Sequence, residues 1–80
     1  MNWHDYIISD SRILVGKPII KGTRISVELI LELLSMGWTE EMIFESYPHL
    51  SKESLNAVFS FLKDTFQNEM FFPYKMDLAS

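Results

Sequence analysis

The sequence predicts a mainly α fold in which three helices follow a short N-terminal β element. One helix-start pattern occurs three times: an apolar residue, then Ser or Thr, then Glu two positions later and an apolar residue four positions after the hydroxyl. The three copies lie at residues 25–30, 38–43 and 50–55. Short β-branched or apolar runs precede them, at residues 6–9, 13–15 and 18–21. A chain of 80 residues, 48% hydrophobic and with 11 aromatic side chains, can build one packed domain but not two.

The three apolar runs predict two or three short strands, because Ser9 to Ser11 and Gly16-Lys17 separate them with turn-forming residues. A small hairpin is marginal in water, so it must pack on the helices or pair with another chain. We therefore expect a single domain over residues 1–80, made of three parts. These are a β element that is also a basic arm (1–25), a three-helix core (26–68) and an apolar tail (69–80).

The helix boundaries follow from capping chemistry. Each Ser or Thr hydroxyl can accept a backbone N–H, which contributes about 1 kcal/mol. The following Glu lies at the positive end of the helix dipole, and the flanking apolar pair forms a hydrophobic staple. Gly37 suits a left-handed residue after a helix, and Pro48 cannot continue one. The predicted helices span residues 27–36, 40–46 and 52–68, and the short connections are of helix-turn-helix length.

Hydrophobic periodicity predicts which helix faces are buried. In the third helix the predicted core stripe consists of Leu55, Val58, Phe59, Leu62 and Phe66. In the first helix the only polar stripe consists of Glu28, Glu32 and Ser35. Apolar side chains cover the rest of that helix, so we expect it to be buried around most of its circumference, in part against a second subunit.

Charge and composition exclude several classes of protein. Seven basic against 11 acidic residues give a net charge of −4, which argues against a uniformly basic nucleic-acid binder. The absence of cysteine excludes a disulfide scaffold and a cysteine zinc site. No stretch approaches a membrane span, and the first residues do not resemble a signal peptide. The expectation is a soluble cytoplasmic protein that binds no membrane.

The charges are unevenly distributed along the chain. Residues 1–25 carry four basic and two acidic side chains, whereas residues 26–80 carry three basic and nine acidic ones. This split indicates an anion-facing arm on an acidic body, although a sample this small also scatters by chance.

Three motifs resemble a known family. They are G-K-P-I-I-K-G-T-R-I at residues 16–25, G-W-T-E-E-M-I at 37–43, and Y-P-H-L-S-K-E at 47–53. Together they resemble the small bacterial domain-of-unknown-function family 433, over about residues 6–62. The resemblance implies a homeodomain-like, helix-turn-helix bundle of three helices with an N-terminal β element, often dimeric. It also implies an antitoxin of a type II toxin–antitoxin pair, partnered with a PIN-like nuclease toxin.

The predicted function is therefore a homodimeric antitoxin that binds such a toxin and operator DNA. The candidate nucleic-acid contacts are Lys17, Lys21, Thr23, Arg24, Lys52 and Asn56. Gly22 permits close backbone approach, and the Arg24 guanidinium can grip phosphate, but Arg24 can equally pair with a helix glutamate. Lys52 and Asn56 would lie on a recognition helix, although an ordinary solvated face explains them as well. The alternative function is a dimeric protein-interaction module that binds no nucleic acid.

The tail supplies the candidate partner contacts Phe71, Phe72 and Tyr74, which could instead fold back over the core. His4 and His49 lack the spacing of metal ligands, and no set of nucleophile, base and orienting group is visible. We therefore expect no catalytic residue, no bound metal and no cofactor.

Overall fold

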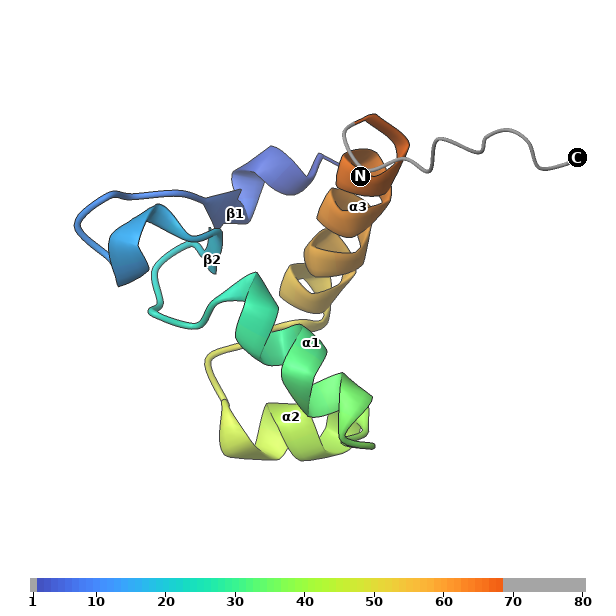
Figure 1. The fold of residues 1–80 in the computed structure, drawn as a ribbon. Coiled ribbons are helices and arrows are strands. Elements are labelled where there is room, and N and C mark those ends of the chain that lie inside the picture. Colours follow the sequence, from blue (N-terminus) through green and yellow to red (C-terminus); the bar gives the residue numbers. More distant parts are fainter. Residues whose placement is uncertain (1, 69–80) are drawn as a thin grey trace, which may run out of the picture.

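Three helices and a two-stranded hairpin form, as the sequence predicts (Figure 1). The structure is a computed structural model and describes residues 2–68. Its elements are a 3₁₀ turn (Trp3–Asp5), β1 (Ile7–Ile8), a second 3₁₀ turn (Leu14–Gly16), β2 (Ile19–Ile20), α1 (Val27–Ser35), α2 (Glu40–Ser46) and α3 (Lys52–Asn68). The predicted bounds of α2 and α3 are confirmed, and α1 ends one residue earlier than predicted.

Each helix begins at the predicted hydroxyl. The side chains of Ser26, Thr39 and Ser51 each accept a hydrogen bond from the backbone N–H three residues later, at 2.9, 3.2 and 3.0 Å. The apolar residues four positions after these caps are almost completely buried; they are Ile30, Ile43 and Leu55. Each start pattern therefore both begins its helix and places one side chain in the centre of the core.

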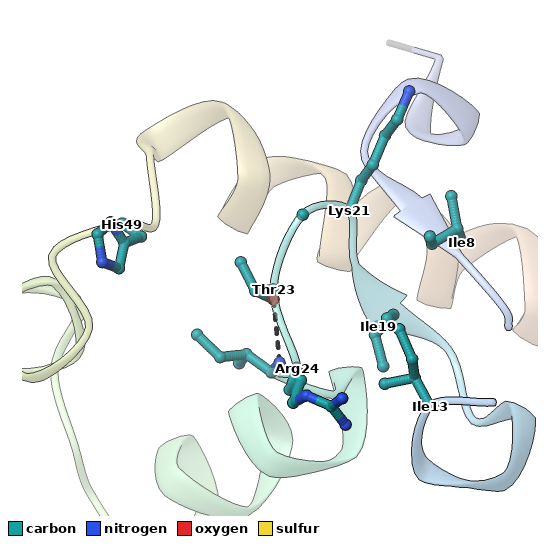
Figure 2. Close-up of a pocket in the computed structure, with 9 residues that line it drawn as sticks. Ile8, Ile13, Ile19, Lys21, Thr23, Arg24 and His49 are labelled. Carbon is teal, nitrogen blue, oxygen red and sulfur yellow. Dashed lines mark hydrogen bonds between the residues drawn. The ribbon is translucent and has the colours of Figure 1, made fainter.

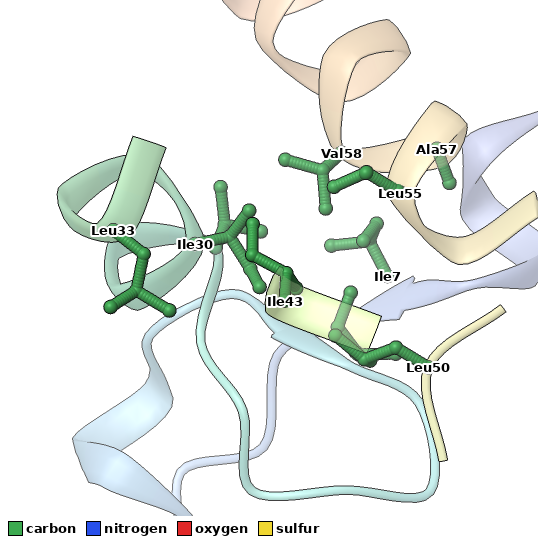
Figure 3. Packing of buried hydrophobic residues seen from close by; sticks show 10 residues of the cluster. Ile7, Ile30, Leu33, Ile43, Leu50, Leu55, Ala57 and Val58 are labelled. Atoms are coloured by element: carbon green, nitrogen blue, oxygen red, sulfur yellow. The ribbon is translucent and has the colours of Figure 1, made fainter. Parts of the chain in front are cut away.

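The strands β1 and β2 pair antiparallel within the chain. Ile7 lies opposite Ile20 and Ile8 lies opposite Ile19. Ile7 and Ile20 belong to the same buried cluster as the helix residues, so the hairpin packs on the helices and closes one side of the core (Figure 3). This packing explains how so short a hairpin is stable.

The second apolar run, residues 13–15, is not a strand. Leu14, Val15 and Gly16 have φ values of 50°, 57° and 81°, which lie in the left-handed region. The backbone closes into a tight turn instead, in which the N–H groups of Gly16 and Lys17 donate to the carbonyls three residues earlier. Residues 14–16 therefore form a 3₁₀ turn in the connection from β1 to β2 and do not add a third strand to the sheet. Val15 in this turn is 93% exposed.

The core face of α3 is rotated from the predicted stripe. Leu55 and Val58 are buried as expected, but Phe59 and Phe66 are 42% and 53% exposed. Ala57 is fully buried in their place. Further along the helix, the ring of Trp3 packs edge-on against Phe61, with ring centroids 4.8 Å apart. The N-terminal turn and the hairpin therefore define which side of α3 faces inward, and helix periodicity alone does not contain that information.

Helix α1 buries one side and exposes part of another. Val27, Ile30 and Leu33 are buried, whereas Leu31 is 36% exposed and Met36, the residue after the helix, is 63% exposed. The buried face of α1 is therefore narrower than the sequence pattern suggests. Within residues 2–68, no helix has both the length and the apolar character needed to cross a membrane.

Candidate functional site

The segment from Lys21 to Arg24 forms a tight turn between β2 and the start of α1. The N–H of Ile20 donates to the carbonyl of Ile25 at 2.9 Å, and Ile19 forms a bridge with Ser26, so the chain doubles back on itself here. Gly22 has a φ of 83°, which suits glycine far better than other residues. The turn presents Lys21 and Arg24, both exposed, from a fixed backbone.

Thr23 stabilises this turn from within. Its hydroxyl donates to the carbonyl of Ile20 at 2.8 Å. It also accepts from the N–H of Ile25 at 3.0 Å, the bond drawn as a dashed line in Figure 2. Because the hydroxyl proton is already committed to Ile20, Thr23 contributes to the shape of the turn rather than a free donor. Its role as a nucleic-acid contact stays a prediction.

An open groove of about 760 Å³ lies against this turn (Figure 2). Four isoleucines form much of its lining, and the turn itself and His49 complete it. The lining residues are Ile8, Ile13, Ile19, Lys21, Gly22, Thr23, Arg24, Ile25 and His49. None of them is acidic, so the groove combines an apolar floor with a cationic rim.

The basic residues divide into two groups according to their partners. The Lys17 ammonium contacts Glu28 at 2.7 Å, and the Lys52 ammonium contacts Glu40 at 2.6 Å. Arg12 pairs with Asp10 at 3.0 Å. Within residues 2–68, Lys21 and Arg24 form no ion pair, and both line the groove. Among the described residues, Lys21 and Arg24 therefore line the groove without a carboxylate partner.

Arg24 does not pair with a helix glutamate in the described part of the chain; Lys17 takes that role instead. This follows from the turn, which points the Arg24 side chain into the groove while Lys17 lies beside the first turn of α1. Sequence alone left the two arrangements open, because both residues belong to the same basic run.

The predicted contacts are only partly brought together. Lys21, Thr23 and Arg24 share the groove, whereas Lys17 and Asn56 do not line it. Asn56 is exposed on α3, one turn after the paired Lys52. The predicted partner contacts Phe71, Phe72 and Tyr74 lie outside the described residues.

His49 is a groove residue that the sequence analysis did not assign. It lies in the connection between α2 and α3, 25 residues after Arg24, and no spacing rule joins the two. The only feature of the sequence that singled out His49 was its place in the Y-P-H-L motif, and that motif indicated a helix boundary rather than a groove. Within residues 2–68 no group of three or more His, Cys, Asp or Glu side chains could hold a metal ion.

Comparison with known proteins gives one match. A family model described as a protein of unknown function, DUF433, matches residues 7–62. No curated protein and no solved structure matches the chain. The match covers more than half of the sequence and includes every residue that lines the groove. The chain therefore belongs to the DUF433 family of proteins of unknown function.

Proposed function

We propose that this chain is the antitoxin of a toxin–antitoxin pair and that it neutralises a PIN-like nuclease by binding it directly. The observation that carries the proposal is the groove, in which Lys21 and Arg24 have no ionic partner within residues 2–68 and lie over an apolar floor. Such a combination of apolar surface and exposed charge is typical of a binding surface. The antitoxin role rests on the motifs at residues 16–25, 37–43 and 47–53.

Co-expression with the product of the neighbouring gene tests this function. We expect the two proteins to co-purify, and we expect K21A/R24A to weaken the complex, because it removes both groove cations. Lys63→Ala is the matched charge control, since Lys63 is exposed on α3, forms no ion pair within residues 2–68 and lies outside the groove. The antitoxin proposal is contradicted if the neighbouring gene does not encode a nuclease, or if its product does not bind this chain.

Contact with operator DNA is the second proposed function. The arrangement of α2, a short turn and α3 favours it, as do the exposed Asn56 and the two unpaired groove cations. The ion pairs of Lys17 and Lys52 oppose it, because each lysine must leave a glutamate before it can neutralise a phosphate. DNA binding is therefore expected to be weak for a single chain.

Fluorescence anisotropy with the DNA upstream of the gene tests this second function. We expect micromolar affinity that falls as salt rises, because bound cations release counterions from DNA. Glu40→Gln should strengthen binding by freeing Lys52, whereas Glu45→Gln, which makes the same charge change elsewhere on α2, should do so less. Binding absent at low salt would instead favour an interaction module that does not recognise nucleic acid.

Homodimerisation is also proposed. The exposed apolar residues Leu31 of α1, Met36 directly after α1, and Met42 of α2 support it. Sedimentation equilibrium of the chain and of a Leu31→Glu variant tests it. We expect a dimer that the variant converts to a monomer. A monomer at high micromolar concentration would remove this part of the proposal.

A further inference from the structure

We propose that the groove binds a short acidic peptide segment of a partner protein, with one large apolar side chain on the isoleucine floor and carboxylates on the rim. This inference deepens the proposed function, since it names the chemistry of the segment that the partner offers. The proposal specifies the chemical class of ligand that the groove binds and does not depend on which protein carries the segment.

The floor fits an apolar side chain. Ile8, Ile13, Ile19 and Ile25 come from β1, the loop after it, β2 and the segment before α1, so four separate pieces of backbone hold them in place. Ile19 is fully buried and has no exposed surface. The other three isoleucines are half-buried, so they supply the surface that a ligand can contact. β-Branched side chains have few rotamers, so this surface is largely formed before a ligand arrives. Aliphatic floors of this kind are suited to Leu, Ile, Met or Phe rather than to a phosphodiester.

The rim fits carboxylates. Arg24 can hold a carboxylate through two parallel hydrogen bonds, and the Lys21 ammonium acts as a point charge. Figure 2 shows that the two side chains leave the turn in different directions, with the Arg24 guanidinium toward Ile13 and the Lys21 ammonium away from it. Two separated cations match two carboxylates on either side of an apolar residue better than they match one phosphate held between them.

The size of the groove agrees with a short segment. Its volume of about 760 Å³ falls within the range of about 300–1,000 Å³ that is usual for sites that bind compact ligands. At Gly22, the point where a Cβ atom would lie in another residue has no atom within 4 Å. The backbone of a bound peptide can therefore approach the turn closely there. No carboxylate lines the groove, so an acidic segment meets no like charge among the lining residues.

A titration monitored by NMR tests the proposal on the full chain. The probe is the peptide acetyl-Glu-Leu-Glu-amide, added to the isotope-labelled protein while backbone amide shifts are recorded. Two matched peptides serve as controls: Gln-Leu-Gln, which lacks the charges, and Glu-Ala-Glu, which lacks the apolar side chain. We expect shifts at residues 19–25 and at His49, with affinity lower by about five-fold or more for either control.

Variants and other anions complete the test. K21A/R24A should abolish the shifts and Lys63→Ala should preserve them, with signal dispersion confirming that both fold. Equal binding of the three peptides, or shifts that map elsewhere, would overturn the proposal. So would inorganic phosphate or a short DNA duplex that produces the same shifts at lower concentration. If the peptide binds but the toxin does not, only the antitoxin role is contradicted. If the toxin still binds the K21A/R24A variant, the groove is not the toxin-binding site.

Discussion

Val15 holds a backbone conformation that a β-branched residue rarely adopts. Its φ of 57° and ψ of 35° lie in the left-handed region, which costs most L-residues roughly 1–2 kcal/mol. Because the side chain is 93% exposed, packing does not compensate for this cost. The hydrogen bonds of the surrounding turn maintain the conformation instead.

Val15→Gly should therefore stabilise the protein. We expect the free energy of unfolding to rise by about 1 kcal/mol, because glycine adopts positive φ without a steric penalty. Urea denaturation measures the change. Val15→Ala is the control, since it keeps a Cβ and should show a smaller gain; a Gly variant less stable than the wild type would mean that Val15 is not strained.

Asp10 and Arg12 form a local pair on the loop after β1. Two hydrogen bonds from the Arg12 side chain, with a third from its backbone N–H, lower the pKa of the Asp10 carboxyl. Since the folded pKa lies below the unfolded one, the pair adds to stability above the unfolded pKa, and that contribution is lost as pH falls through the folded value. We expect Arg12→Ala to raise the Asp10 pKa toward its ordinary range in an NMR titration of the side-chain carboxyl. An unchanged pKa would show that the backbone N–H alone is responsible.

At the scale of elements, hydroxyl caps determine where the helices begin. Ser26→Ala removes the acceptor for the Leu29 N–H and should lower the free energy of unfolding by about 1 kcal/mol. Ser35→Ala is the matched control in the same helix, where the hydroxyl is exposed and only donates to the Glu32 carbonyl. Thermal and urea unfolding should leave that control within about 0.5 kcal/mol of the wild type. Equal losses in both variants would contradict a specific role for the cap.

The sequence was most informative where the deciding interactions are local. Caps and helix breakers act within four residues, so the bounds of α2 and α3 could be predicted to the residue. The left-handed turn at Leu14 and Val15 could not, because its residue types favour a strand and the turn overrides them. The same limit applies to the groove: Lys21, Thr23 and Arg24 are neighbours in sequence, whereas His49 reaches it only through the packing of the helices.

At the scale of the whole molecule, one cluster joins the hairpin to all three helices (Figure 3). Ile30 lies within it with no exposed surface, so Ile30→Ala should cost about 2–5 kcal/mol through lost burial and a residual cavity. Phe59→Ala should cost less than about 1 kcal/mol, because Phe59 is 42% exposed. Chemical denaturation of both variants measures the difference. Similar losses of unfolding free energy in the two variants would show that Phe59 belongs to the core, as the hydrophobic periodicity of the third helix predicts.

The contact between Trp3 and α3 has a consequence for the order of folding. The Trp3 indole N–H donates to an Asp64 carboxylate oxygen at 2.7 Å, across a sequence separation of 61 residues. Closing so long a loop carries an entropic cost that local helix contacts avoid, so we expect this bond to form after the three helices have collapsed. We then expect the N-terminal turn to dock last and open first, so amide hydrogen exchange in it should be faster than at the other hydrogen-bonded amides of residues 2–68. Trp3 also contacts Phe61, whereas Trp38 packs against the core, so the fluorescence of a Trp38→Phe variant should report that final step separately from formation of the core.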